Sequence, residues 1–128
     1  MKRVLIVDDD PCVVEVIAAN LQAEGYEVET ASDGDEAWRR VTADMPDLIV
    51  LDWMLPGRTG LELLADLRRD GRASRVPIVL LTAKARDSEI WEGWQAGADY
   101  YLTKPFQMEQ LLYYLDVLLG AEADAGLG

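Results

Sequence analysis

Short apolar segments alternate with longer amphipathic segments along the chain. The short ones are rich in branched residues and bounded by Gly, Pro or Asp, which predicts strands at residues 4–7, 26–30, 48–52, 76–81 and 99–102. The longer ones carry apolar residues at helical spacing, which predicts helices at residues 11–24, 35–44, 61–70, 87–96 and 108–119. Strands that alternate with helices indicate a parallel sheet covered by helices on both faces.

The segment at residues 48–52 is the most informative of the strands. Four apolar residues run together from Leu48 to Leu51 and are followed by Asp52. An unbroken apolar run of this length predicts a strand that is buried on both faces. Residues 4–7 and 76–81 are equally apolar, so we expect these three strands at the centre of the sheet. The predicted fold class is a doubly wound α/β domain.

Composition narrows the class of protein. A chain of 128 residues with half of them hydrophobic is long enough for one domain with a substantial core. The net charge of −12 argues against direct binding to nucleic acid, which needs clustered Lys and Arg. The sequence has no histidine, which excludes catalytic triads and zinc sites that depend on it. A single cysteine, no signal-peptide pattern and no membrane-length apolar run predict a cytoplasmic location.

Polar side chains follow several of the predicted strands directly. Asp8 and Asp9 follow the first strand, and Asp52 ends the third. Thr82 follows the fourth strand, and Lys104 comes just after the fifth. In a parallel sheet these positions meet at one edge, where ligands bind in folds of this class.

Clustered carboxylates repel each other and need a cation. Two unit charges about 4 Å apart interact by roughly 4 kcal/mol at an effective dielectric constant of 20. Lys104 supplies one positive charge, and oxygen ligands favour Mg²⁺, with Mn²⁺ as the other candidate. The alternative is that the three acids at 8–10 only cap the helix that Pro11 opens. We assign that capping role to Asp10 and the cation site to Asp8 and Asp9.

Taken together, these segments resemble the response-regulator receiver domain (CheY-like) of bacterial two-component signalling, from residue 2 to about residue 119. The matching segments are VLIVDDD at 4–10, PDLIVLD at 46–52, LPG at 55–57, PIVLLTA at 77–83 and GADYYLTKPF at 97–106. The resemblance implies a five-stranded (βα)5 flavodoxin-like sheet with strand order 2-1-3-4-5. It also implies a receiver domain at residues 1–120, followed by a flexible tail at 121–128.

The resemblance implies a role for each residue of the site. Asp52 would accept a phosphoryl group from phosphohistidine on a sensor kinase. Asp8, Asp9, Asp52 and the backbone carbonyl of Met54 would hold Mg²⁺. Lys104 would pair with Asp52 and then with the phosphoryl group.

It further implies a switch, in which the hydroxyl of Thr82 turns toward the phosphoryl group and Tyr101 moves into the vacated space. The peptide bond between Lys104 and Pro105 would be cis, while Met54 and Lys84 would tune the lifetime of the phosphoryl group.

The implied partners are a sensor histidine kinase or phosphotransfer protein, and a downstream protein or an output domain outside this sequence. The chain would be a monomer or a weak dimer that depends on phosphorylation, because residues 100, 114 and 116 depart from the charged pattern of receivers that dimerise through helix 4, strand 5 and helix 5.

Two alternatives remain: a pseudo-receiver that binds partners without phosphorylation, and a metal-dependent phosphotransfer enzyme on other substrates. A receiver catalyses its own phosphorylation and dephosphorylation, so its classification as an enzyme stays open.

Overall fold

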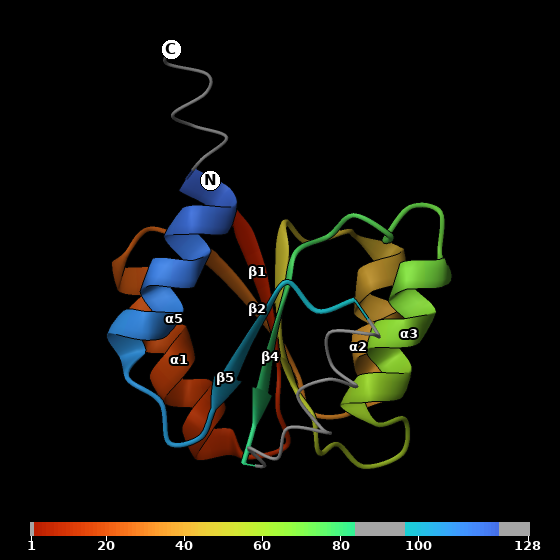
Figure 1. Cartoon of the computed structure of the whole chain (residues 1–128), viewed down its shortest axis with the longest axis horizontal. Coiled ribbons are helices and arrows are strands. Elements are labelled where there is room, and N and C mark those ends of the chain that lie inside the picture. The colour runs from red at the N-terminus through yellow and green to blue at the C-terminus, as the bar shows by residue number, and fades with distance from the viewer. Residues whose placement is uncertain (1, 84–96, 121–128) are drawn as a thin grey trace.

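A five-stranded parallel sheet forms the centre of the molecule (Figure 1). The computed structural model describes residues 2–83 and 97–120. The strands are β1 (Arg3–Val7), β2 (Glu27–Ala31), β3 (Leu48–Asp52), β4 (Ile78–Thr82) and β5 (Tyr100–Thr103). Their order in the sheet, β2-β1-β3-β4-β5, confirms the predicted topology and places the three most apolar strands at the centre.

Helices cover both faces of this sheet. They are α1 (Pro11–Ala23), α2 (Gly34–Ala43), α3 (Gly60–Arg69) and α5 (Met108–Leu115), and a π-helical turn η1 (Asp116–Gly120) continues α5. In Figure 1, α1 and α5 lie on one side of the sheet and α2 and α3 on the other. The predicted helix at 87–96, Lys84 and the predicted tail at 121–128 lie outside the described residues. No helix in the described ranges combines the length and apolar character that a membrane crossing requires.

The core consists of two hydrophobic layers, one on each face of the sheet. Leu5 and Val7 of β1 pack in the layer beneath α2 and α3, whereas Val4 and Ile6 pack in the layer beneath α1 and α5. This division follows from the alternation of side chains along a strand. All five residues of β3 are buried, as its continuous apolar run predicts.

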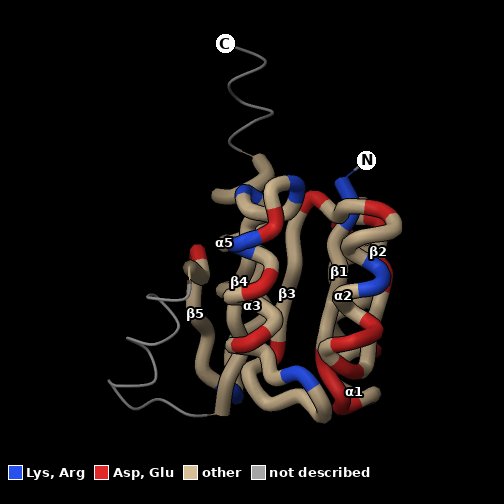
Figure 2. The backbone as a smooth tube through the Cα atoms, turned by 90° about the vertical axis from the view of Figure 1, so that its right-hand side faces the viewer, with Lys and Arg blue, Asp and Glu red and all other residues tan. Residues whose placement is uncertain are grey.

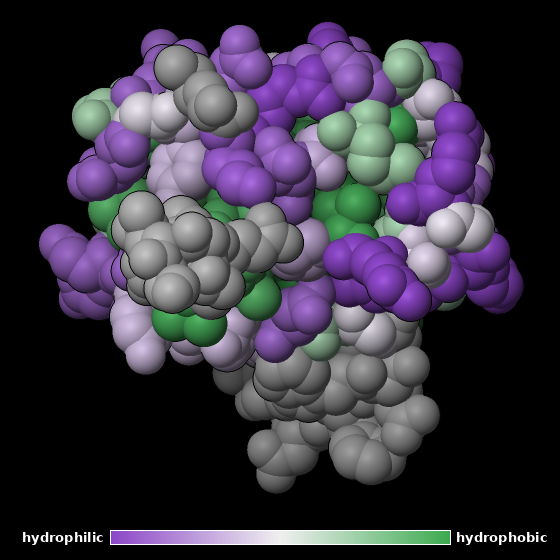
Figure 3. Space-filling view, turned by 90° about the horizontal axis from the view of Figure 1, so that it is seen from above, coloured by the Kyte–Doolittle hydropathy of each residue, from purple (hydrophilic) through white to green (hydrophobic). Residues whose placement is uncertain are grey.

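The strands all point the same way, so their carboxyl ends share one edge. Figure 2 shows acidic residues at the ends of β1 and β3 and at the start of α1, all at the lower end of the view. Figure 3 looks at the opposite end, where hydrophilic residues form much of the surface and hydrophobic residues show in smaller patches between them. The sheet therefore gathers acids at the edge where the sequence predicts a site.

Candidate functional site

Three carboxylates converge at the carboxyl edge of the sheet. Asp8 follows β1, Asp9 comes next, and Asp52 is the last residue of β3. One oxygen from each of the three lies within 4.8 Å of the others. Asp8 and Asp52 are 1% and 5% exposed, whereas Asp9 is exposed, so the cluster has two buried members and one that faces solvent. Such a set of oxygen donors fits a hard divalent cation such as Mg²⁺.

Local backbone geometry explains why the acids converge. The backbone N–H of Asp10 donates to Oδ1 of Asp8 at 2.9 Å, which holds that carboxylate beside the chain that leads into α1. Asp10 is the N-cap residue of α1, and its side chain accepts the N–H of Cys12 at 2.9 Å. The prediction that Asp10 caps this helix is therefore confirmed.

Lys104 is the cation of this site. Its Nζ lies 2.8 Å from Oδ2 of Asp8 and 3.5 Å from Oδ2 of Asp52. The predicted contact with Asp52 is present, but the shorter contact is to Asp8, which sequence reasoning did not anticipate. The peptide bond between Lys104 and Pro105 is cis.

The carboxylates and the ammonium group change each other's ionisation. Burial and the nearby charge of Asp8 raise the pKa of Asp52 to about 6, against the lowering effects of Lys104 and the backbone of Met54. Burial by itself lowers the pKa of Lys104, but the hydrogen bond that Lys104 donates to Asp8 and the charge of Asp52 outweigh it, and the net pKa is raised. Lys104 is therefore charged at neutral pH, and the carboxyl group of Asp52 releases its proton at a higher pH than an exposed Asp does.

Asp52 also contacts the loop that follows it. The backbone N–H of Met54 points to Oδ1 of Asp52 at 3.4 Å, and the side chain of Met54 is 55% exposed. The backbone N–H of Trp53 donates to the carbonyl of Leu81 at 2.8 Å, which ties the start of the loop to β4. The residue expected to supply a carbonyl ligand is therefore next to the acid cluster.

Thr82 and Tyr101 lie on neighbouring strands. Thr82 is fully buried at the end of β4, and its carbonyl accepts the backbone N–H of Lys104 at 2.6 Å. Tyr101 is half-buried and meets the ring of Trp53 edge-on, with centroids 6.4 Å apart. Tyr100 packs in the opposite layer of the core, as the predicted alternation requires. The contact between Trp53 and Tyr101 links the loop after Asp52 directly to β5.

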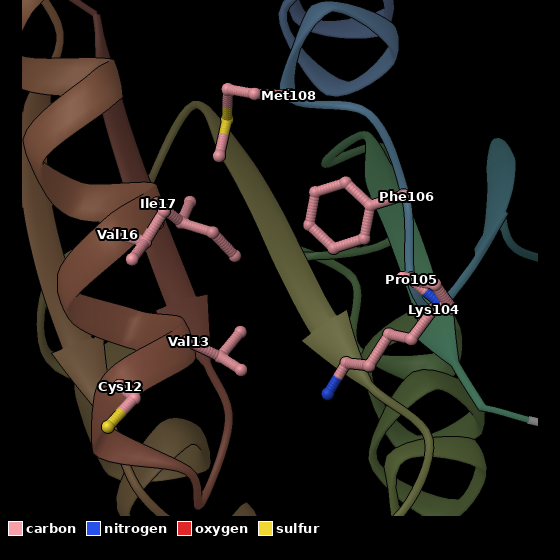
Figure 4. A pocket seen from close by; sticks show the side chains of 8 residues that line it. All are labelled: Cys12, Val13, Val16, Ile17, Lys104, Pro105, Phe106 and Met108. Atoms are coloured by element: carbon pink, nitrogen blue, oxygen red, sulfur yellow. The ribbon is translucent and has the colours of Figure 1, made fainter.

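An apolar groove opens beside Lys104. It has a volume of about 590 Å³ and runs between α1 and the segment that joins β5 to α5. In Figure 4, Val13 and Ile17 of α1 point across the groove toward Phe106, and the amine of Lys104 points toward the end of β3. Val16, which also lines it, is 56% exposed. This groove was not predicted from the sequence, although Val13, Val16 and Ile17 have the spacing of residues that share one helix face.

The sequence matches the family described as the response regulator receiver domain over residues 4–116. The chain belongs to this family. This receiver is 40% identical to the phosphate regulon transcriptional regulatory protein PhoB of Rhizobium meliloti over 119 residues, which are 93% of the chain but 52% of that protein. The receiver thus spans about half the length of the curated relatives it matches.

Two solved structures resemble the receiver closely. The chemotaxis protein CheY4 of Vibrio cholerae is 37% identical with a TM-score of 0.87, covering 93% of this chain and 99% of that one. The response regulator TrrA of Thermotoga maritima, solved in complex with Mg²⁺ and BeF, is 38% identical with a TM-score of 0.83, covering 93% of this chain and all of that one, 100%. These similarities confirm the fold and the family that the sequence segments indicated.

Proposed function

We propose that this receiver accepts a phosphoryl group on Asp52 from phosphohistidine on a histidine kinase or phosphotransfer protein, or from a small phosphodonor. The observation that carries the proposal is the cluster of Asp8, Asp9 and Asp52 in contact with Lys104. The relative TrrA was solved in complex with Mg²⁺ and BeF, which supports the proposal that this receiver also binds Mg²⁺.

The chain's own groups suit a nucleophilic displacement at phosphorus. An oxygen of the Asp52 carboxylate forms the new O–P bond as the P–N bond to the donor imidazole breaks, and the electron pair stays on the ring nitrogen. Lys104 lies where its ammonium group can pair with a phosphoryl oxygen. Asp8, Asp9, Asp52 and the Met54 carbonyl would hold Mg²⁺, which would neutralise the charge on the phosphoryl oxygens.

The new charge on Asp52 would then be transmitted to β5. Phosphorylation adds roughly −1.5 to −2 charge and strong acceptor oxygens. Thr82 would donate its hydroxyl to the phosphoryl group, and Tyr101 would repack. The contact between Tyr101 and Trp53 supports this coupling, because Trp53 follows the acceptor directly. The lifetime of the phosphoryl group would be tuned by the exposed Met54 and by Lys84. The output would be a downstream protein or an output domain outside this sequence.

The donor protein would dock in the apolar groove. Lys104 lines both the groove and the acid cluster, so an apolar helix face seated between α1 and Phe106 would carry its phosphohistidine to Asp52. Replacement of the exposed Val16 by Asp should slow phosphotransfer from a histidine kinase domain at least several-fold and leave uptake from acetyl phosphate unchanged. Equal loss with both donors, or none with either, would contradict this docking.

Incubation of the protein with acetyl phosphate and Mg²⁺, followed by measurement of its intact mass, tests whether Asp52 is phosphorylated. Wild type should gain one phosphoryl group, and Asp52→Asn should gain none. Asp10→Asn is the matched control, since Asn also caps helices well and the change removes one charge from the same acidic segment. Uptake by Asp52→Asn would refute the assignment of the acceptor. A wild type that binds Mg²⁺ but takes no phosphate from either donor would instead indicate a pseudo-receiver.

A further inference from the structure

The loop from Trp53 to Thr59 begins at the proposed phospho-acceptor and is held at both ends by close backbone contacts. Gly60, the first residue of α3, donates its N–H to the carbonyl of Trp53 at 3.0 Å. A Cβ at Gly60 would overlap the carbonyl oxygen of Asp52 and lie 2.9 Å from Cα of Trp53. The start of α3 is therefore pressed against the backbone of the acceptor.

The far end of the loop is pressed against α2 in the same way. A Cβ at Gly34, the first residue of α2, would overlap the carbonyl oxygen of Arg58 and lie 2.7 Å from its Cβ. Only a glycine allows this approach. The backbone of Arg58 is thus closely fitted to α2.

The guanidinium group of Arg58 bridges two helices. Its Nε lies 3.6 Å from Oδ1 of Asp35 in α2, and its Nη1 lies 3.4 Å from Oδ2 of Asp66 in α3. Its central carbon lies 5.1 Å from the centre of the Trp38 ring, within the range of a cation–π contact. The side chain is 27% exposed, so these contacts form in a partly desolvated site.

We infer that Arg58 is a positioning residue for the phosphorylation site, because it clamps the loop that carries Met54 to α2 and α3. The inference rests on the proposed function. Met54 lies in this loop, and its backbone N–H points to the carboxylate of Asp52. Release of the loop from α2 and α3 would therefore disturb the geometry of the residues that hold the cation. Arginine suits the role because its planar fork can engage two carboxylates and an aromatic face together, which lysine cannot.

The test uses the sign of the change in Mg²⁺ affinity, measured by calorimetry with Mg²⁺ alone. Loss of a positive charge near an acidic pocket should by itself strengthen Mg²⁺ binding or leave it unchanged. Loss of the contacts between Arg58 and the two helices should instead weaken Mg²⁺ binding. We expect Arg58→Gln and Arg58→Lys both to weaken Mg²⁺ binding by about threefold or more, which is less than the 10- to 100-fold effect of groups that bond directly to metal ligands.

Arg69→Gln is the matched control. Arg69 pairs with the same Asp66 but is 73% exposed, and within the described part of the chain its ion pair does not extend to α2 or to the loop. Its replacement removes the same charge and should leave Mg²⁺ affinity at the wild-type value. Hydrogen exchange without Mg²⁺ gives a second readout: amides of residues 53–60 should exchange faster in Arg58→Gln than in Arg69→Gln.

The outcomes separate this inference from the proposed function. Wild-type Mg²⁺ affinity in both Arg58 variants, with unchanged exchange in the loop, would overturn the positioning role while leaving Asp52 as the acceptor. Weakened binding in Arg69→Gln to the same degree would also overturn it, because the weakening would then not depend on the contacts that Arg58 makes with α2 and α3. A wild type without Mg²⁺ binding would overturn the proposed function and this inference with it.

Discussion

Removal of the charge on Asp52 should stabilise the metal-free receiver at neutral and alkaline pH. The folded protein raises the pKa of this carboxyl from 3.8 to about 6. The folded state therefore binds the proton more tightly than the unfolded state, and stability falls as pH rises between the two values. Asn has nearly the same shape as a protonated Asp and carries no charge. Asp52→Asn should consequently be free of this loss.

The size of the effect follows from the shift. The difference between 3.8 and about 6 is roughly two pKa units, and each unit corresponds to about 1.4 kcal/mol. The upper limit is thus about 3 kcal/mol, reached above the folded pKa and absent below the unfolded one. We expect Asp52→Asn to be more stable than wild type by about 1–3 kcal/mol near pH 8 and by no more than about 0.5 kcal/mol near pH 4.

Urea unfolding with EDTA, followed by far-ultraviolet circular dichroism across this pH range, measures the difference directly. Glu15→Gln is the control, because Glu15 is an exposed carboxylate on α1. Its replacement should change stability by less than about 0.5 kcal/mol at every pH, as is usual for surface positions. A stability difference for Asp52→Asn that does not vary with pH, or that has the opposite sign at pH 8, would refute the argument from burial and the charge of Asp8.

Three further results are expected from the same site. Mg²⁺ at ten times its dissociation constant should stabilise wild type by about 1.4 kcal/mol in urea unfolding and Asp52→Asn by clearly less; equal gains would place the cation elsewhere. Gly60→Ala should cost more than about 2 kcal/mol of unfolding free energy because its Cβ has no room, whereas Gly71→Ala, with no atom within 4 Å, should cost almost nothing. Lys104→Met should destabilise the protein by about 1–3 kcal/mol near pH 8, since Asp8 loses its buried partner, and by less near pH 4; a loss independent of pH would contradict the ion-pair explanation.

The fold could be predicted from the sequence because the apolar pattern of each segment agrees with its place in the sheet. The continuous apolar run at 48–51 favours burial on both faces, and β3 indeed lies in the interior of the sheet, between β1 and β4. Helix boundaries were predicted within about one or two residues where a cap was visible, as at Asp10 and Pro11. The end of the last helix was less predictable, since the π turn from Asp116 to Gly120 has no simple sequence signal.

The sequence also determined which residues meet at the site. Asp8, Asp9, Asp52 and Lys104 each lie at or just after the end of a strand, and parallel strands bring these positions to one edge whatever the details of packing. The chemical types of these residues already indicated a cation, and the resemblance to receiver domains implied a phosphoryl group. Their convergence is therefore a property of the order of residues along the chain.

Only the tertiary structure decided how those residues are paired and supported. Asp8 rather than Asp52 makes the shorter contact to Lys104. The ring of Tyr101 in β5 contacts the ring of Trp53, which follows β3. The clamp at Arg58 joins a loop to two helices. Such contacts depend on side-chain direction and on distances of a few ångströms between segments far apart in sequence. Periodicity reports which face a residue occupies, and it carries no information about which neighbour on that face the residue will touch.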